Sequence, residues 1–278
     1  MEPQQSSLYA KYMETLKWEV VRMDEVNIFL RKFPILGGIM KIHRPLQLPN
    51  IKRLLPILQK NKIKTLVIEP VSSENQTKLN TWCRAVSKYV HISTTPYLAT
   101  KTFRIDLSQP EEEMFKSFSE AKRRAVRRAT KLGVVVQQSD SIDDLIQIKN
   151  KSAGLFGFIT TTGIKNFWPI FSPDHAAILL AHSITHNNEV VGGVLLLFWD
   201  GVAYYWIAGA LKKGKKLFAP TLLVWEAIKL SKQHGCKLFD FVGVWDERLP
   251  KENKEWLGFT KFKEGFGGST LYYPLTGF

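Results

Sequence analysis

The chain has 278 residues, of which 45% are hydrophobic and 23% are charged, and this balance excludes disordered, collagen-like and coiled-coil classes. Its 39 Lys and Arg residues outnumber 25 Asp and Glu, so the net charge of +14 favours a polyanionic partner: nucleic acid, an anionic membrane surface or a phosphorylated metabolite. The longest apolar stretch has about half the ~20 residues of a membrane helix, and the first residues lack a signal-peptide pattern. We therefore expect a cytoplasmic protein without a transmembrane segment.

Apolar residues recur with helical and strand periods in alternation along the chain. The first third predicts helices over residues 8–16, 51–59 and 79–89 and strands over 20–23, 26–30, 37–43, 65–69 and 102–107. Ser108, followed by Pro110 and three acidic residues, predicts the start of a long helix that ends at Gly133. The remainder predicts strands over 134–136, 178–185, 190–198, 202–208 and 237–242 and helices over 142–152 and 219–234.

From about residue 110 the order is helix, strand, helix, antiparallel meander, helix and strand, which is similar to the core of GNAT acetyltransferases. The N-terminal third offers a shorter mixture of the same kind. We therefore expect an α/β (α+β) fold of two GNAT-like domains, with mixed sheets flanked by helices. The N-terminal domain is expected over residues 1–110, with residues 268–278 returning to it, and the C-terminal domain over residues 111–267.

Several familiar sites are excluded by residue type and spacing. The two cysteines, Cys83 and Cys236, lie far apart, and the six histidines contain no H-E-x-x-H pattern, so we expect neither a disulfide framework nor a metal site. Residues 209–216 nearly match the phosphate loop G-x-x-x-x-G-K-[ST]. Lys216 occupies the place of the hydroxyl residue that binds Mg²⁺, so an NTPase is not expected.

Two clusters of basic residues are candidate phosphate sites. The first lies on the long helix, where one face is cationic and the apolar positions Phe118, Ala121, Ala125 and Ala129 are expected to pack; its basic residues are Lys122, Arg123, Arg124, Arg127, Arg128 and Lys131. This is either a solvated face or a surface for phosphates, and crowding of like charges favours the second. The second cluster, residues 212–216, precedes the helix from Ala219, where a GNAT core binds the pyrophosphate of coenzyme A. Because Ala219 stands where that signature needs glycine, phosphate binding is expected but coenzyme A does not follow.

Two motifs lie near the C-terminus: Asp-Phe-Val-Gly-Val at residues 240–244 and Phe-Lys-Glu-Gly-Phe-Gly-Gly at residues 262–268. Upstream are a Pro…Thr…Asp-Leu-Ser pattern at residues 96–108, an Arg-x-x-Val-Arg-x-Ala…Gly-Val helix at 123–134 and a Tyr-x-x-x-Gly-Ala strand at 205–210. Trp18 and residues 37–46 complete the series. In order and spacing, over nearly the whole chain, these motifs resemble the Fem (FemABX-like) peptidoglycan interpeptide-bridge aminoacyltransferases.

The resemblance implies a pair of GNAT-like domains without a cofactor. It also implies transfer of an amino acid from aminoacyl-tRNA to an amine on the stem peptide of a peptidoglycan precursor, a step of cell-wall synthesis. The implied partners are aminoacyl-tRNA, a UDP-linked or lipid-linked precursor, and the inner membrane surface as a peripheral contact. Both substrates are polyanions, which agrees with the net charge of +14.

The resemblance also implies roles for individual residues. Lys263 is a cation near the reacting centre, or alternatively a surface lysine beside a glycine turn. Asp240 orients a donor or accepts a proton, or alternatively caps the loop after its strand. Tyr205 contacts substrate, or alternatively belongs to the core. The remaining expected substrate-binding residues are basic: Lys41, Arg44, Arg123, Arg127, Lys165 and Lys215.

One departure from the family concerns precursor binding. The family carries an Arg just before its Gly-Phe segment and another after it, and here residues 155–156 and 159–168 contain neither. Lys165 is expected as a substitute, although it is a point charge without the bidentate guanidinium. Two other functions stay open: an acyl-CoA-dependent N-acyltransferase of GNAT type, and a non-catalytic RNA- or anion-binding protein. Transfer to a protein N-terminus or to a lipid shares the same chemistry.

Overall fold

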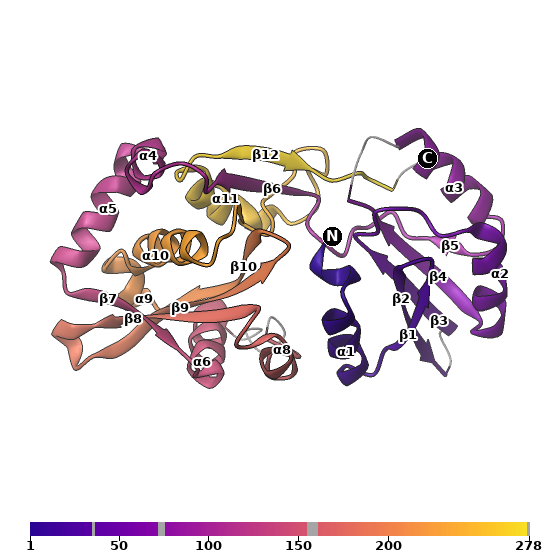
Figure 1. Cartoon of the computed structure of the whole chain (residues 1–278), viewed down its shortest axis with the longest axis horizontal. Coiled ribbons are helices and arrows are strands. Elements are labelled where there is room, and N and C mark those ends of the chain that lie inside the picture. The colour runs from indigo at the N-terminus through magenta and orange to yellow at the C-terminus, as the bar shows by residue number, and fades with distance from the viewer. Residues whose placement is uncertain (35–36, 72–75, 155–160, 277–278) are drawn as a thin grey trace. The chain divides into compact units, whose positions relative to one another are not determined.

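The computed structural model describes residues 1–34, 37–71, 76–154 and 161–276. These divide into two compact units: unit 1, residues 1–101 with 271–278, and unit 2, residues 102–270 (Figure 1). The Gly157-Phe158 segment and the two residues before it, on which the family's arginines were sought, lie outside the described residues. Among the described helices, none has the length and apolar character needed to cross a membrane.

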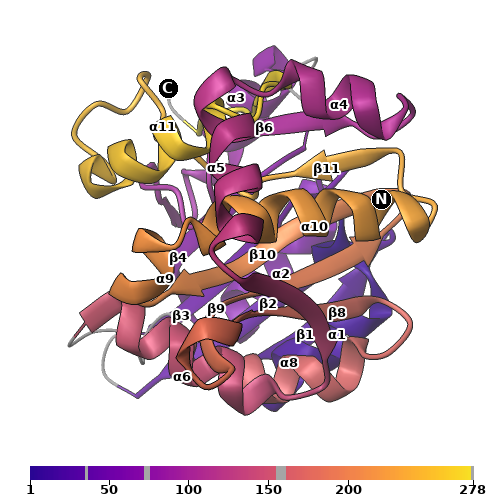
Figure 2. The same ribbon diagram turned by 90° about the vertical axis from the view of Figure 1, so that its left-hand side faces the viewer.

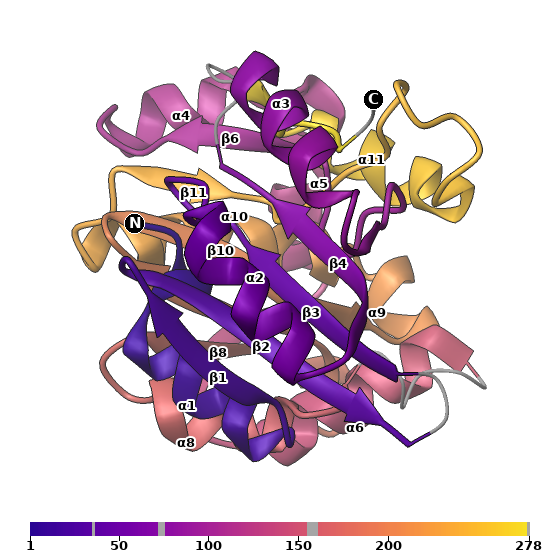
Figure 3. The same ribbon diagram turned by 90° about the vertical axis from the view of Figure 1, so that its right-hand side faces the viewer.

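Unit 1 is a five-stranded sheet in the order β1-β2-β3-β4-β5. The first three strands are antiparallel, and β3, β4 and β5 run parallel. Its elements are η1 (Pro3–Gln5), α1 (Ser7–Thr15), β1 (Glu19–Met23), β2 (Val26–Phe33), β3 (Gly37–His43), α2 (Ile51–Lys60), β4 (Ile63–Glu69), α3 (Gln76–Val86) and β5 (His91–Ile92). Helix α1 lies on one side of the sheet and α2 and α3 on the other (Figures 1 and 3).

Strand alternation gives the two faces of this sheet different characters. On the face toward α2 and α3, residues such as Ile42 and Ile68 form an apolar core with Leu54 and Trp82. Alternate positions of β3 and β4 point to the other face and include Lys41, His43 and Glu69, and His43 stands opposite Glu69 in the strand register. Unit 1 thus has one apolar face and one face that buries ionisable groups.

Unit 2 is a seven-stranded sheet in the order β12-β6-β11-β10-β9-β8-β7. Its helices are α4 (Glu111–Ser117), α5 (Glu120–Lys131), α6 (Ile142–Ala153), α8 (Ile164–Phe171), α9 (Lys212–Lys216), α10 (Ala219–Gln233) and α11 (Leu257–Glu264), with η3 (Ile184–His186) and η4 (Lys254–Trp256). Its strands are β6 (Lys101–Asp106), β7 (Val134–Ser139), β8 (Ala176–Ser183), β9 (Glu189–Trp199), β10 (Val202–Ala210), β11 (Leu238–Asp240) and β12 (Ser269–Tyr272). Helices α5 and α10 cover one face of the sheet, and α6 and α8 cover the other (Figures 1 and 2).

Strands β10 and β11 separate within this sheet. They pair in parallel only over residues 202–204 and 238–240. Strand β10 then continues to Ala210, with a bulge between Tyr205 and Ile207 where it pairs with β9. The edge of β10 that faces β11 therefore lacks a strand partner beyond Tyr204, and the chain after Asp240 turns into loop. Beyond the point where β10 and β11 diverge, the segments that follow the two strands in sequence carry the candidate site.

The α/β fold with mixed sheets flanked by helices is confirmed, but one predicted helix is wrong. The expected helix from Ser108 to Gly133 is two helices, α4 and α5. Phe118 takes an extended backbone and enters the core, and Ser119 starts α5 by accepting a hydrogen bond from the Lys122 amide. Ser108 caps no helix, because α4 begins at Glu111 after Pro110, whose side chain makes no cap.

The packing face of α5 agrees only in part with the predicted one: Ala129 is buried as expected, and Ala121 and Ala125 are not. Val126 and Ala129 are the buried residues of the helix, whereas Ala121 is exposed and Ala125 half-buried. The break at Phe118 resets the rotation of the helix, so a phase taken from Phe118 is displaced.

Candidate functional site

The candidate site is built around the side chain of Lys263 on α11. Its ammonium nitrogen Nζ donates hydrogen bonds to the carbonyl oxygens of Phe241, at 2.8 Å, and Gly243, at 2.7 Å. The two C-terminal motifs, about twenty residues apart in sequence, therefore meet at one nitrogen atom. Phe266, which follows in the second motif, is fully buried against Phe241, so this segment is packed into unit 2.

The carboxylate of Asp240 shapes the loop that holds Lys263. Asp240 is 1% exposed, and it accepts hydrogen bonds from the Thr102 hydroxyl, the Arg104 Nε and the Val242 amide, each at 2.7 Å. Because three donors bind its two oxygens, this carboxylate has a structural role. Asp240 thus caps the loop after β11 and positions the carbonyls that Lys263 binds.

That loop has a strained backbone. Val242 has a φ of 58°, which is rare for a β-branched residue, and Gly243 has a φ of 127°. The Thr102 hydroxyl accepts from the Gly243 amide at 3.2 Å. These side-chain hydrogen bonds offset the cost of the turn and direct the carbonyls of Phe241 and Gly243 toward Lys263. Local strain held by surrounding bonds is typical of functional sites.

The environment of Lys263 lowers its pKa from 10.5 to about 7. Burial of the side chain is the main cause, the Asp240 carboxylate opposes it, and the positive charge of Lys149 adds to it. An ammonium has three N–H donors, and two of them are taken by the carbonyls. Near neutral pH the remaining position is either a donor, when the lysine is protonated, or a lone pair. Lys263 can therefore stabilise a negative charge or exchange a proton.

Two further lysines add positive charge in sequence: Lys149 acts on Lys263, and Lys215 acts on Lys149. Lys149 on α6 is half-buried, and its pKa is lowered by burial and then by the charge of Lys215. The backbone of β10 at Gly209 packs directly against Lys149, since a Cβ at Gly209 would lie 2.9 Å from the Lys149 Cα. Among the described residues, no ion pair neutralises Lys149, Lys215 or Lys263. The positive charge of Lys149 repels those of Lys263 and Lys215, and an anion bound between them would offset this repulsion.

The region before α10 does not fit the pyrophosphate of coenzyme A. A backbone cradle needs free amides at the helix start. Here the amides of Lys215, Leu217, Phe218, Thr221 and Leu222 all donate to carbonyls of the chain, and Pro220 has no amide hydrogen. Gly214 packs so closely against β9 that a Cβ at this position would overlap the Val191 carbonyl oxygen. The region offers lysine side chains to phosphates, and few backbone donors.

Four other predicted site residues of unit 2 lie apart from these contacts. Tyr205 is a buried core residue whose ring packs on Phe239 and Phe241. The Arg123 guanidinium donates to the carbonyls at residues 116 and 118 and so closes the end of α4. Arg127 is exposed, with its guanidinium over the Phe115 ring. Lys165 is exposed and forms an ion pair with Asp143 at 2.5 Å.

Lys41 and Arg44 belong to unit 1. The Lys41 ammonium lies 3.8 Å from the centre of the Tyr97 ring and 5.0 Å from that of Trp18, so its charge is held between aromatic faces. Arg44 is buried, donates to the Ala99 carbonyl at 2.6 Å, and stacks 3.4 Å from the centre of the Tyr273 ring. Arg44 therefore ties the C-terminal segment to unit 1. Within the part of the chain that the structure describes, Lys41 forms no ion pair, and its pKa is lowered by burial, which the charge of Glu69 opposes.

Beside Lys41, unit 1 buries a pair of ionisable groups, His43 and Glu69. His43 Nε2 lies 3.3 Å from Glu69 Oε2, and burial lowers the pKa of His43 to about 3 and raises that of Glu69. The other oxygen of Glu69 accepts from the Tyr97 and Leu98 amides at 2.7 Å. The pair thus fixes the loop whose Tyr97 ring covers Lys41. Among the described residues, no cluster of three or more His, Cys, Asp or Glu is arranged to hold a metal ion.

Sequence reasoning missed Lys149 and the role of Arg104. A lone lysine in an amphipathic helix carries no signal that it will face a site, because its neighbours come from strands far away in sequence. Thr102 was part of a quoted motif, but only the antiparallel pairing of β6 with β11 shows that it reaches Asp240.

Comparisons with known proteins agree with this fold. The profile of the acetyltransferase (GNAT) domain matches residues 116–256, which is just over half of the chain. FemX has a similar structure, with a TM-score of 0.75, 15% identity, and coverage of 98% of this chain and 90% of FemX. A search of curated proteins found no match.

Two further structures share the fold. The C-terminal domain of a putative lysylphosphatidylglycerol synthetase from Agrobacterium fabrum has a TM-score of 0.59 at 10% identity, covering 97% of this chain and 86% of that one. A tandem GNAT protein from the clavulanic acid biosynthesis pathway has a TM-score of 0.55 at 10% identity, covering 91% and 80%. These likenesses confirm the FemABX-like tandem GNAT fold that the motifs predict.

Proposed function

The chain belongs to the acetyltransferase (GNAT) domain family, and from this premise we propose that it transfers an amino acid from aminoacyl-tRNA to an amine on the stem peptide of a peptidoglycan precursor. The acyltransferase class follows from the family. The observation that supports an aminoacyl donor is the Lys263 site, a half-buried cation held by two carbonyls and flanked by further lysines. We place the reaction in the cytoplasm, with the precursor either UDP-linked or lipid-linked.

The chemistry is aminolysis of an ester. The neutral acceptor amine attacks the carbonyl carbon of the aminoacyl ester, so a C–N bond forms and the carbonyl oxygen becomes an oxyanion. The third N–H of protonated Lys263 stabilises that oxyanion, as a preorganised donor in a partly dry site does. The C–O bond to the ribose then breaks, the amine nitrogen loses a proton, and the ribose oxygen gains one.

The lysines around Lys263 suit the donor. The 3′ end of a tRNA carries several phosphates close to the ester, and Lys149 and Lys215 supply charge for them without a backbone cradle. Arg127 and its exposed neighbours on α5 supply a further cationic surface for the tRNA backbone. An acyl-CoA donor is the weaker alternative, because the amides at the start of α10 are taken within the chain.

A second candidate function is transfer of the amino acid to a lipid. It is favoured by the similarity of the fold to that of the putative lysylphosphatidylglycerol synthetase, whose name denotes a lipid that carries lysine. The ester aminolysis step would become transfer to a lipid hydroxyl, with the same role for Lys263.

The test is a transfer assay with the purified chain. Charged tRNA with a labelled amino acid is incubated in turn with UDP-linked precursor, lipid-linked precursor and phosphatidylglycerol, and the products are weighed by mass spectrometry. A stem peptide heavier by one amino acid is expected, and Lys263→Met should abolish it. Lys261→Met is the matched control, because Lys261 lies on the same helix with its side chain exposed. No product from any aminoacyl-tRNA, together with saturable coenzyme A binding in calorimetry, would overturn the proposal.

A further inference from the structure

The two helices that cover one side of the unit 1 sheet carry charge of a single sign. Neither α2 nor α3, nor the turn up to Val90 that follows α3, contains an Asp or Glu. Among the described residues, one of the basic side chains has an ion-pair partner, since Arg53 is paired with Asp24. The basic side chains of this α2–α3 face are all exposed: Lys52, Arg53, Lys60, Lys78, Arg84 and Lys88.

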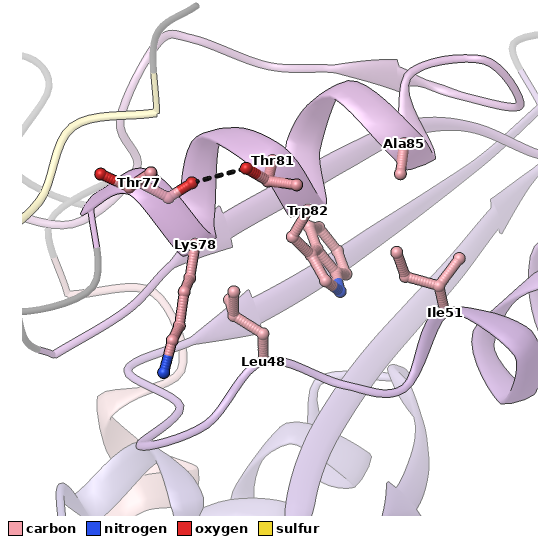
Figure 4. Close-up of a pocket in the computed structure, with 7 residues that line it drawn as sticks. All are labelled: Leu48, Ile51, Thr77, Lys78, Thr81, Trp82 and Ala85. Carbon is pink, nitrogen blue, oxygen red and sulfur yellow. Dashed lines mark hydrogen bonds between the residues drawn. The ribbon is translucent and has the colours of Figure 1, made fainter.

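An apolar groove opens within the same face. It is lined by the side chains of Leu48, Ile51, Trp82 and Ala85, with Lys78 at its rim and two threonines of α3 (Figure 4). The hydroxyl of one threonine donates to the carbonyl of the other at 2.9 Å, and the Trp82 Nε1 donates to the Pro49 carbonyl. The polar atoms of the groove are thus largely satisfied, and hydrocarbon side chains form its walls.

Two large apolar side chains that are close in sequence to the residues of the groove are also exposed. Leu46, two residues before Leu48, is 70% exposed, and Tyr89, in the turn after α3, is 57% exposed. Apolar and aromatic side chains beside two helices that carry Lys and Arg and no acid of their own are the composition of surfaces that lie in the interface of a bilayer. Each Lys or Arg near an anionic leaflet adds to the attraction.

From these observations we propose that the α2–α3 face docks on an anionic phospholipid bilayer. The basic side chains contact lipid phosphates, and Leu46 and the groove at Trp82 contact the upper part of the acyl chains. The groove itself favours lipid over RNA, because its walls are largely aliphatic and Trp82, the aromatic residue that lines it, is 7% exposed, which leaves little ring surface inside the groove on which a base could stack. This docking proposal rests on the proposed function only if the acceptor is lipid-linked. Otherwise it is independent, because the face binds a bilayer whether or not transfer occurs.

The experiment is co-sedimentation of the full chain with vesicles. Vesicles of phosphatidylethanolamine with phosphatidylglycerol are compared with vesicles of phosphatidylcholine alone. The first should pellet the protein, with binding that weakens as salt is raised, and the second should not. The double variant Lys78→Glu with Arg84→Glu should weaken binding by about 30-fold or more, which is the effect of removing two cations from an anionic surface.

A matched control reverses the same charge elsewhere in unit 1. Lys11→Glu with Lys17→Glu changes two exposed lysines on or just after α1, on the other side of the sheet, and should leave vesicle binding within about 3-fold. Leu46→Ser should weaken binding by about 10-fold through loss of apolar contact, and its folding should not change because the side chain is exposed.

Three outcomes would overturn the inference: equal binding to both kinds of vesicle, equal loss in the two double variants, or loss of tRNA binding with vesicle binding unchanged in Lys78→Glu with Arg84→Glu. The last outcome would make the face an RNA surface. Transfer to the water-soluble UDP-linked precursor is measured in parallel. It should persist in the Lys78→Glu and Arg84→Glu variant, so failure of docking and failure of the proposed activity are separate results.

Discussion

Replacing Lys263 by Met gives a direct measure of the buried ammonium. The folded chain holds this lysine with a pKa of about 7, against 10.5 for an unperturbed side chain. Above pH 7 the folded protein loses the proton and the unfolded chain keeps it up to about pH 10. Stability therefore rises with pH wherever the unfolded state binds more protons. The methionine variant lacks this group, and the other titrating groups contribute nearly equally to both proteins.

The size of the effect follows from the shift. The difference of 3.5 between 10.5 and 7 corresponds to about 5 kcal/mol over the whole range, at about 1.4 kcal/mol for each pH unit. Between pH 7 and pH 9 the wild type should gain about 2 kcal/mol of unfolding free energy relative to Lys263→Met, because the folded lysine is still partly protonated just above pH 7. Because Lys263 is partly exposed, this value is an upper bound.

The assay is urea unfolding of both proteins at pH 6, 7, 8 and 9, with Lys261→Met as a reference that should track the wild type. Below pH 7 the variant should be at least as stable as the wild type, because burying a charge costs more than burying a thioether. In the transfer assay the same variant should lose about 100- to 1000-fold in kcat/KM, the usual cost of removing one oxyanion donor. A stability difference that stays constant from pH 6 to 9 would refute the reasoning, since it would mean that Lys263 titrates as a solvated lysine.

Five further substitutions test other parts of unit 2. Asp240→Asn should lower the free energy of unfolding by about 3 kcal/mol, because a buried ion pair is broken. It should also move the alkaline limb of the transfer rate to lower pH, because a charge that raises the pKa of Lys263 is lost. An alkaline limb that does not move would mean that Asp240 has no effect on the pKa of Lys263. Gly268→Ala should destabilise by about 2 kcal/mol in urea unfolding, since its φ is 92° and a Cβ would overlap a backbone oxygen, whereas Gly258→Ala in open space should be neutral or stabilising. Arg127→Ala should reduce the salt slope of tRNA binding by about 0.7 to 0.9 with stability unchanged, while Arg123→Ala should cost about 1 kcal/mol of stability by uncapping α4; the reverse pattern would contradict both assignments.

The C-terminal motifs show how far sequence alone can go. The resemblance of the motifs around Asp240, Gly243 and Lys263 to those of the Fem family was enough to nominate Lys263 and Asp240 as site residues. It was not enough to separate their environments, because the three donors that occupy Asp240 come from β6 and from the turn itself. Pairing between strands more than a hundred residues apart is set by the whole sheet. A motif contains no information about it.

The basic helix shows a different limit. The helical period correctly indicated a cationic surface, but it ran through the break at Phe118 because Phe, Ser and Glu are all tolerated within a helix. The decisive effects were local and tertiary: Ser119 caps α5, and the core accepts the Phe118 ring. With the break in place, Arg123 turns toward the open carbonyls of α4. A residue that charge counting assigns to phosphate binding is thereby used for capping.

Tyr205 illustrates the third limit, which is burial. A tyrosine in a meander strand reads the same whether its ring faces a site or the core, since both positions alternate with period two. The bulge beside it, between Tyr205 and Ile207, shifts that alternation by one residue. The outcome depends on the packing of Phe239 and Phe241 beneath the sheet, which only the assembled structure shows.

The three lysines at the diverging strands make a further prediction about how the donor binds. Lys149 depresses the pKa of Lys263, and Lys215 depresses that of Lys149, so an approaching phosphate that offsets this repulsion should raise the pKa of Lys263 and of Lys149. At pH 8 Lys263 is mostly deprotonated, and binding of tRNA should therefore take up close to one proton. Calorimetry in buffers of different ionisation enthalpy measures that number directly: uptake should be large at pH 8, small at pH 6, and absent at both in Lys263→Met. Equal proton uptake in the wild type and the variant would show that the anion binds elsewhere, and the site would then lose its link to the donor.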